Sequence, residues 1–414
     1  MRKLTAVLTA ILLLPFCLPA LEYGLIVDQN AAAGGAADAD PIADYQAGLI
    51  PRISGLFGET SDKLYGDFVV TAGVTAGMTL GIENDFYFVP ELLRTELTLR
   101  FGAAKLTAGR MQYSAPFAYA ADGLFDGLQF AYNGPSGMFY AGAWYTGLLY
   151  KKKANITITE EDYVSYSAAV EYKDFAETYF ASKRMAAALG WEYPALANLL
   201  RTKLAVIAQI DLNDRDDKLH SQYLTAKIGI PANQFTFELS GAVDLAQVST
   251  LDGKETNIGL AGEAGIFWTT PTKFPSRISL NGYFSSGKKK EGSLAAFVPI
   301  TDKHCGSILE AKLSGISAFG IDYTALLHKT LSLGFTSTYF MRNDLGTYKK
   351  YPVDVMDEEG YLLGNEFFAR AMWIPASDLQ FNLGGGVFLP AIGNAAPERN
   401  PVWRVKLAAV LAIF

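Results

Sequence analysis

The sequence is poor in cysteine, histidine and charged residues. Its 414 residues include two cysteines and three histidines, and 19% of them are charged, whereas about a quarter is usual in soluble proteins. Cys17 lies in an N-terminal apolar stretch, so a chain without that stretch would keep Cys305 alone. A disulfide framework and a thiolate metal cluster are therefore excluded, and no cofactor is predicted.

The sequence also lacks a long apolar run and an excess of positive charge. Beyond the first twenty residues, no apolar run approaches the ~20 residues that a spanning helix needs. The net charge of −7 argues against a nucleic-acid partner, because it would repel phosphate. Half of the residues are nevertheless hydrophobic and 13% are aromatic, which excludes disorder. This combination is typical of an all-β transmembrane barrel, whose antiparallel strands are apolar on one face only.

The N-terminus has the pattern of a secretory signal peptide. Two basic residues, at 2 and 3, precede an apolar stretch over 4–18, and a small residue, Ala20, follows it. A basic segment, an apolar segment and a small residue at the cleavage site define such a signal. Pro15 within the stretch and Pro19 directly after it argue against the alternative, a retained membrane anchor. We therefore predict a signal peptide over 1–20 and a single outer-membrane barrel domain over 21–414.

Two segments show clearly the two-residue period of a strand with one apolar face. Between residues 234 and 246, apolar residues occupy the odd positions and polar or small residues the even ones. Between residues 308 and 327, the odd positions are again mostly apolar, and charged residues stand only at even positions. In a barrel the apolar face points at lipid and the polar face lines the lumen.

The spacing of the strand-like segments separates a barrel from a sandwich. Every second connection is short, as in barrels that alternate short periplasmic turns with long extracellular loops. The short connections fall near 134–137, 194–198, 230–233, 270–275, 328–329 and 375–377, and the long ones at 112–126, 151–177, 213–219, 247–256, 287–305, 343–360 and 389–400. We predict about 18 strands, with roughly 16 as the alternative. The first strand would be 21–27, a loop would follow at 28–44, and both termini would be periplasmic.

The segment 151–177 admits two interpretations. Residues 163–172 alternate like a strand, but Thr159 followed by three acidic residues is typical of a helix N-terminus. We prefer one extracellular loop that contains a helix. A loop of this length could also fold inward and constrict the lumen.

Aromatic residues gather near the predicted strand ends. Trp191, Trp268 and Trp373 fall near the periplasmic ends of their strands, as an interfacial girdle requires, while Trp144 lies nearer mid-strand and does not fit. The chain ends on Phe414, after an amphipathic strand over 401–414. A terminal aromatic residue resembles the signal that barrel-assembly machinery recognises, so this machinery is a predicted partner together with outer-membrane lipid.

One segment, 103–133, resembles porin-like barrels of the alginate-export type. A strand ending in Gly109-Arg110 leads through a loop to Phe125-Asp126-Gly127, which opens the next strand. The resemblance implies an outer-membrane channel with a strongly basic lumen. The inward-facing residues that we infer here are instead nearly balanced in sign.

The sequence offers no acid–base pair for catalysis, and an enzyme is not predicted. His220 and Ser221 are adjacent on a strand and therefore point to opposite faces. His304 lies in a loop and His328 in a turn. No spacing of carboxylates resembles a metal-binding loop.

The predicted function is passive diffusion of small hydrophilic solutes through a porin-like channel in the outer membrane of a diderm bacterium. A barrel of this size encloses an aqueous channel unless loops fill it, and its selectivity follows from radius and ring charge. The alternative is a non-conducting surface barrel whose extracellular loops bind a ligand or host partner. The candidate pore-lining residues are Arg94, Glu96, Arg100, Arg184, Lys203, Asp211, Glu238, Asp244, Glu263, Arg277, Glu310, Lys312, Asp322, Glu366 and Arg370.

Overall fold

The computed structural model describes residues 20–59, 62–81, 85–157, 159–167, 169–197, 199–250, 253–272, 274–288, 294–353 and 359–414. The predicted signal peptide lies outside these residues except for Ala20, so it remains a prediction. In the described ranges, no helix is long and apolar enough to cross a membrane.

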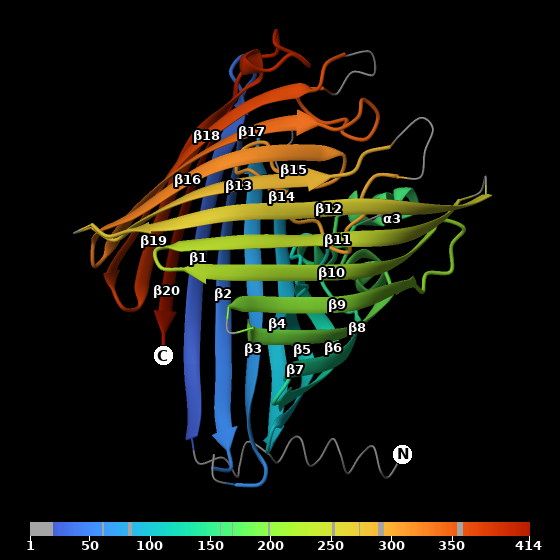
Figure 1. Cartoon of the computed structure of the whole chain (residues 1–414), viewed down its shortest axis with the longest axis vertical. Coiled ribbons are helices and arrows are strands. Elements are labelled where there is room, and N and C mark those ends of the chain that lie inside the picture. The colour runs from blue at the N-terminus through green and yellow to red at the C-terminus, as the bar shows by residue number, and fades with distance from the viewer. Residues whose placement is uncertain are drawn as a thin grey trace.

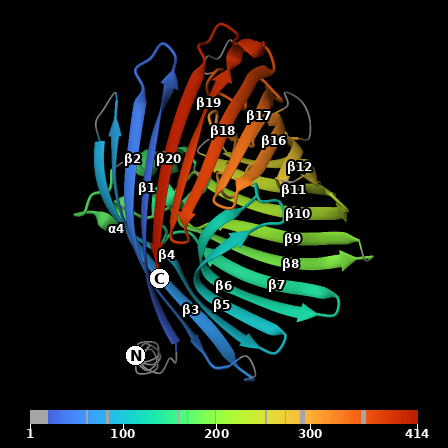
Figure 2. The ribbon, with the colours of Figure 1, turned by 90° about the vertical axis from the view of Figure 1, so that its left-hand side faces the viewer.

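Eighteen antiparallel strands form one closed sheet (Figures 1 and 2). Each strand pairs with its neighbours in sequence, and the last strand pairs with the first, Leu25 lying opposite Ile413. Closure leaves no sheet edge along this pair. The strands are β1 Ala20–Ala36, β2 Ile42–Phe57, β3 Tyr65–Leu80, β4 Asp85–Phe101, β5 Ala104–Ser114, β6 Asp122–Gly134, β7 Gly137–Tyr145, β8 Arg184–Leu196, β9 Leu200–Asp211, β10 Lys218–Ala232, β11 Phe235–Thr250, β12 Gly253–Thr270, β13 Ser276–Ser285, β16 Ile316–His328, β17 Leu331–Arg342, β18 Leu362–Ala376, β19 Leu379–Leu389 and β20 Val402–Ile413. The predicted fold class and the count of 18 are confirmed.

The connections alternate between a short-turn end and a long-loop end. The short-turn end carries 102–103, 135–136, 197–199, 233–234, 271–275, 329–330 and 377–378, together with 58–64. Residues 115–121, 146–183, 286–315, 343–361 and 390–401 connect strands at the other end. The connection 286–315 contains a short strand pair, β14 His304–Cys305 and β15 Ala311–Lys312. Four further connections at this end, 37–41, 81–84, 212–217 and 251–252, are as short as those at the short-turn end, so the predicted alternation holds only in part.

Four predicted boundaries are wrong. The first strand extends to Ala36, and most of 28–44, predicted as a loop, belongs to β1 and β2. This stretch is rich in alanine and glycine, so it lacks an apolar alternation, and backbone pairing on both sides holds it in the sheet. Similarly, β11 and β12 continue into the predicted loop 247–256. Finally, residues 308–315 belong to the connection 286–315, called the inward loop below, and β16 begins only at Ile316.

In the connection 146–183, the described residues form three helices and no barrel strand. They are α2 Lys151–Ala154, α3 Glu160–Ser167 and α4 Phe175–Thr178. At the start of α3 the Asp162 backbone N–H donates to Thr159 Oγ1 (3.3 Å), and the Thr159 N–H donates to Asp162 Oδ2 (3.2 Å). This reciprocal cap satisfies two free N–H groups, and it confirms the helix predicted at Thr159.

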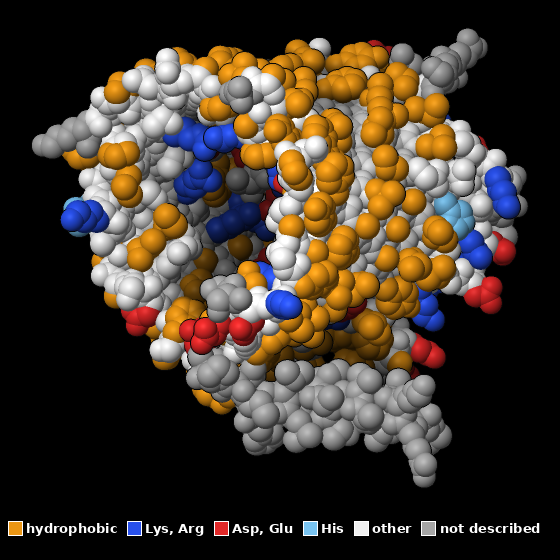
Figure 3. Space-filling model, turned by 60° about the horizontal axis from the view of Figure 1, so that its bottom comes forward, with side chains coloured by type: hydrophobic (Ala, Val, Ile, Leu, Met, Phe, Trp, Pro, Cys, Tyr) orange, Lys and Arg blue, Asp and Glu red, His pale blue; other side chains and the backbone are white. Residues whose placement is uncertain are grey.

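The outer surface of the barrel is apolar. On β16, Phe319, Ile321 and Tyr323 are exposed, while Asp322 between them points to the interior. Figure 3 shows hydrophobic side chains over the outer surface and Lys and Arg side chains inside the hollow. Aromatic pairs lie near the short-turn end, where Trp191 stacks on Tyr193, Trp268 on Phe235 and Trp373 on Phe381. The three tryptophans are thus placed as predicted.

Loops fill one side of the barrel interior. Phe117 of 115–121 and Phe297 of 286–315 are fully buried in one cluster with Trp144 of β7 and Tyr223 of β10. Trp144 therefore faces inward, which explains why it does not join the outer girdle. Backbone hydrogen bonds join three of the loops, from Thr157 N to Ile300 O (2.9 Å), from Ile300 N to Ala120 O (2.7 Å) and from Asp302 N to Asn155 O (2.5 Å). The loops thus form one packed body, and its buried cluster also includes residues of β16 to β19, such as Phe340 and Phe388.

The wall contains a seam between β4 and β5. Within the described strands, β5 pairs with β4 only from Thr95 to Phe101, so the part of β4 before Thr95 pairs on one side, with β3. There, side chains donate the hydrogen bonds that a neighbouring strand would otherwise supply to β4. Tyr179 Oη donates to Pro90 O (2.8 Å), Tyr172 Oη donates to Phe88 O, and the Arg110 guanidinium donates to Leu92 O. Proline suits this position, because an edge strand needs no ladder N–H.

Candidate functional site

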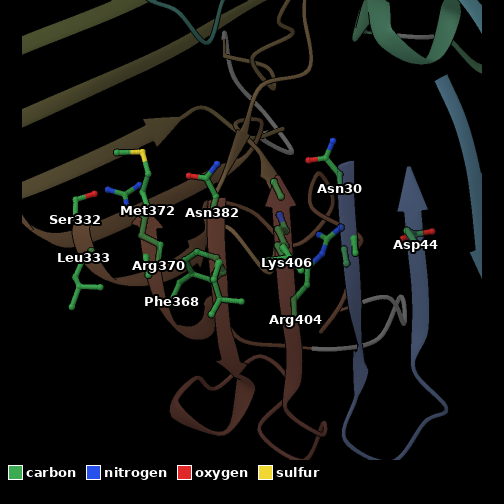
Figure 4. Close-up of a pocket in the computed structure, with 18 of the residues that line it drawn as sticks. Asn30, Asp44, Ser332, Leu333, Phe368, Arg370, Met372, Asn382, Arg404 and Lys406 are labelled. Carbon is green, nitrogen blue, oxygen red and sulfur yellow. The ribbon is translucent and has the colours of Figure 1, made fainter. Parts of the chain in front are cut away.

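The open space inside the barrel lies along the wall that the loops leave bare. A hollow of about 840 Å³ is lined by β1, β2 and β16 to β20, including Asn30, Asp44, Arg370, Arg404 and Lys406 (Figure 4). A second hollow of about 470 Å³ shares Thr324 and Arg370 with the first and reaches Arg277, Tyr119, Tyr283 and Cys305. The two hollows together follow one side of the barrel.

Two basic side chains of β20 line the larger hollow, and both contact one acid of the inward loop. Arg404 and Lys406 project from the same face of β20 because they are two residues apart. Glu310 Oε2 lies 2.6 Å from Arg404 Nη1, and Glu310 Oε1 lies 2.8 Å from Lys406 Nζ. Burial alone would raise the pKa of Glu310, but the hydrogen bonds from Lys406 and Arg404 outweigh burial and hold this pKa below its usual value.

The smaller hollow combines a stacked cation with an ion pair. The Arg277 guanidinium lies 4.2 Å from the centroid of the Phe267 ring, a cation–π contact. Asp322 Oδ2 accepts a hydrogen bond from Thr336 Oγ1 (2.6 Å) and lies 3.4 Å from Arg370 Nη2. This part of the wall therefore offers charges of both signs.

Glu366 holds the inward loop against the wall. It is 1% exposed, and its carboxylate accepts three backbone N–H groups, from Ser307 (2.6 Å), Ile308 (3.0 Å) and Leu309 (3.0 Å). Lys312, on the same loop, pairs with Asp302. The prediction that Lys312 and Glu310 stand on a barrel strand is wrong, because both lie on the loop before β16.

Several predicted residues form ion pairs between neighbouring strands. Lys203 of β9 pairs with Glu192 of β8 (2.9 Å), and Glu238 of β11 pairs with Lys227 of β10 (2.7 Å). Glu263 of β12 lies opposite Tyr283 of β13. Further pairs join Arg94 to Glu96 and Arg100 to Asp67. These residues lie away from the hollow that Arg404 and Lys406 line.

Besides Glu366, three of the predicted pore-lining residues lie beneath loops. Arg184 and Asp244 are 0% exposed and Asp211 is 5% exposed. Asp162 of α3 pairs with Arg184 (2.9 Å), and Val298 N of the inward loop donates to Asp244 (3.4 Å). The sequence placed these three side chains on an open inner wall, but the structure makes them anchors of the loops. Alternation gives the face of a strand, and it does not reveal which part of that face a loop covers.

Three residues that line the larger hollow, Asp44, Arg404 and Lys406, were not predicted from the sequence. Asp44 fell in the predicted loop 28–44, and Arg404 and Lys406, within the predicted strand 401–414, were not among the candidate residues. Two basic residues on the inner parity of one strand were the available signal. Phe414 follows the same parity, and its ring centroid lies 5.8 Å from the Arg52 guanidinium carbon.

The segment that carries the family resemblance forms a compact ion pair. Arg110 and Asp126 lie directly opposite each other on β5 and β6. Their contacts are bidentate, Nε to Oδ1 at 2.9 Å and Nη2 to Oδ2 at 2.8 Å, and Arg110 Nη2 also donates to Leu148 O at 2.8 Å. The glycine before Arg110 has a φ of 115°, and a Cβ there would lie 2.2 Å from Thr95 O. The Gly-Arg and Asp-Gly pairs therefore close the seam and fasten the loop 146–183.

The histidines are scattered over the structure. His220 Nδ1 accepts from Asp211 N (3.2 Å), and His328 contacts Thr330 (3.0 Å) in a turn. Burial lowers the pKa of His304 in β14. Among the residues that the structure describes, no group of three or more His, Cys, Asp or Glu could hold a metal ion.

Comparison with known proteins shows a shared fold. No family model and no curated protein sequence matches the chain. Among solved structures, OpdQ of Pseudomonas aeruginosa is 12% identical with a TM-score of 0.59, and the match covers 95% of this chain and 98% of OpdQ. OccK2 (OpdF) of the same organism, in complex with glucuronate, is 11% identical with a TM-score of 0.59 and coverages of 96% and 98%. The outer membrane protein OprD is 17% identical with a TM-score of 0.56 and coverages of 95% and 94%. The chain therefore has a porin-like barrel fold.

Proposed function

We propose that the protein is an outer-membrane channel for passive diffusion of small hydrophilic solutes. The observation that carries the proposal is the hollow of about 840 Å³ inside a closed barrel, lined in part by Asp44, Arg370, Arg404 and Lys406 and continued by the second hollow along the same wall. The apolar outer face suits lipid, and the similar barrel OprD is an outer membrane protein. The localisation in the outer membrane of a diderm bacterium is part of this proposal.

The charges of the hollow favour small polar solutes over a long polyanion. Arg370, Arg404 and Lys406 face the same space as Asp44, and Glu310 already contacts two of the bases. One similar structure, OccK2, holds glucuronate, a small carboxylate, which supports a small charged or polar solute here. We also propose a more specific resemblance to barrels of the alginate-export type, which rests on segment 103–133.

A second candidate is a non-conducting barrel that binds a partner with its loops. The packed body of three loops on one side of the interior favours it. The channel hypothesis and the partner-binding hypothesis differ in one measurable quantity, the ion flux through the purified protein.

Single-channel recording in planar bilayers tests the proposal. Purified protein should insert and give discrete conductance steps, whereas the heat-denatured sample should give none. Liposomes that contain the protein should swell in small neutral sugars and stop swelling as sugar size increases. Folded protein that gives neither conductance nor swelling would refute the channel and leave the partner-binding candidate.

Two assignments about biogenesis belong to the same proposal. A signal peptide over 1–20 would direct export, and the assembly machinery would recognise the last strand with Phe414, whose side chain is 78% exposed. Deleting Phe414 should reduce the amount of heat-modifiable protein in the outer membrane. Equal amounts of the deletion variant and of the parent protein would contradict this assignment.

A further inference from the structure

Glu310 lies where the inward loop reaches across to the far wall. Its φ is 44°, a left-handed backbone conformation that few residues other than glycine adopt. Its carboxylate contacts β20, and Lys406 lies 96 positions after Glu310 in the sequence. The loop therefore holds this one acid in a sterically unusual conformation against a distant strand.

Each oxygen of the carboxylate serves one cation. Arg404 Nη1 contacts Oε2 at 2.6 Å and Lys406 Nζ contacts Oε1 at 2.8 Å, so neither base shares an oxygen with the other. The side chains of Arg404, Lys406 and Glu310 are 29%, 38% and 36% exposed. An ion that passes along this wall would therefore meet all three charges.

Two neighbouring bases already pair with other acids. Lys312 contacts Asp302, and Arg370 contacts Asp322. Removal of the Glu310 charge would leave two bases on β20 facing the hollow without this carboxylate. A ring of fixed charge sets ion selectivity in a pore, so the sign of the wall depends strongly on this residue.

We propose that Glu310 is a specificity-determining residue that limits the preference of the pore for anions by neutralising Arg404 and Lys406. The inference rests on the proposed channel function and deepens it. A residue that only tied the loop to β20 would use the same contacts, so the test must separate charge from tethering.

The test measures the reversal potential of the purified protein in planar bilayers with a KCl gradient. Glu310→Gln should raise the permeability ratio of chloride to potassium severalfold over the parent protein, while Glu310→Asp, which keeps the charge, should stay near the parent ratio. Glu398→Gln is the matched control, because it removes one acid from the exposed loop between β19 and β20. Its ratio should equal the parent ratio.

A charge-compensating variant distinguishes the two roles. Glu310→Gln with Lys406→Gln removes one charge of each sign, and the ratio should return toward the parent value although the tether stays broken. A role in tethering alone predicts no such return.

Three results would refute either the channel function or the role of Glu310. A parent protein that folds but never conducts refutes the proposed channel function. A conducting parent with the same ratio in Glu310→Gln and Glu398→Gln overturns the inference about Glu310 and leaves the channel intact. If Glu310→Gln does not assemble, as judged by heat-modifiable migration, Lys406→Gln alone must lower the ratio, and an unchanged ratio overturns the inference.

Discussion

Arg184 is expected to be the main anchor of α3 and its loop. The side chain is 0% exposed. Its Nη2 lies 2.9 Å from Asp162 Oδ2 on α3, and its Nε lies 3.5 Å from Asp211 Oδ2 on β9, while Nη1 donates to Thr157 O. One guanidinium thus compensates two carboxylates that are each 1% exposed at the side chain.

Replacement of Arg184 by methionine leaves buried carboxylates behind. Breaking a buried ion pair by removing one partner costs about 3–5 kcal/mol. Asp211 keeps hydrogen bonds from Asn213 Nδ2 (2.8 Å) and Leu219 N (3.3 Å), and Asp162 keeps Arg215 at 3.1 Å. Because these contacts remain, we expect the loss of stabilising free energy to be near the lower value, about 3 kcal/mol. The loss should appear as local opening of 146–183, because the strand pairs of the barrel remain intact.

Hydrogen exchange of the detergent-solubilised protein measures this opening. In Arg184→Met the amides of α3 should exchange roughly a hundredfold faster than in the parent, since about 1.4 kcal/mol corresponds to a factor of ten. Arg201→Met, at an exposed position of β9, is the matched control and should change exchange very little.

Adding Asp162→Asn to Arg184→Met should recover part of the loss, because it removes a buried charge that has lost its main partner. Unchanged exchange of α3 in Arg184→Met would refute the assignment of Arg184 as anchor. Faster exchange that Asp162→Asn does not reduce would refute the reasoning from uncompensated charge.

Three further changes test other features. Tyr179→Phe removes the hydroxyl that caps Pro90 O at the seam, and should destabilise the loop there by about 1 kcal/mol, seen as faster exchange in 169–183 with unchanged exchange in β10 and β11. Gly109→Ala should reduce assembly of the barrel, because φ is 115° and a Cβ would lie 2.2 Å from Thr95 O. The control Gly102→Ala should cost only backbone strain, because no atom lies within 4 Å of the added Cβ. Equal amounts of heat-modifiable protein for the two variants would contradict this. Burial raises the pKa of the Cys305 thiol to about 12, so the reactive thiolate is scarce near neutral pH and maleimide should label Cys305 only after unfolding; rapid labelling of the folded protein would contradict the burial.

The seam between β4 and β5 gives the loop 146–183 a role in the wall as well as in the interior. Three backbone carbonyls of β4 receive their hydrogen bonds from Tyr172, Tyr179 and Arg110. The Arg110–Asp126 pair, in the segment that resembles alginate-export barrels, is therefore part of the closure of the wall. The sequence displayed this motif, but its partners came from a loop that lies dozens of residues further along the chain.

The sequence by itself determined the architecture, because strand alternation and connection length are local properties. A strand between lipid and lumen must be apolar at every second position, and segments such as 234–246 record this directly. Where the local signal was absent, the prediction failed. The alanine- and glycine-rich end of β1, which lies in the predicted loop 28–44, is a strand because β2 and β20 supply backbone partners on its two sides.

The tertiary structure alone decided which inner residues face open space. Alternation placed Arg184, Asp244 and Arg370 equally on the inner face, yet loops cover the first two, and the third lines the hollow. It also decided that Glu310, assigned from its spacing to a strand, sits on a loop and contacts Arg404 and Lys406. Such contacts depend on how the barrel closes and how the long loops fold into it. The alternation of residues along the chain does not predict that arrangement, because the partners are far apart in sequence.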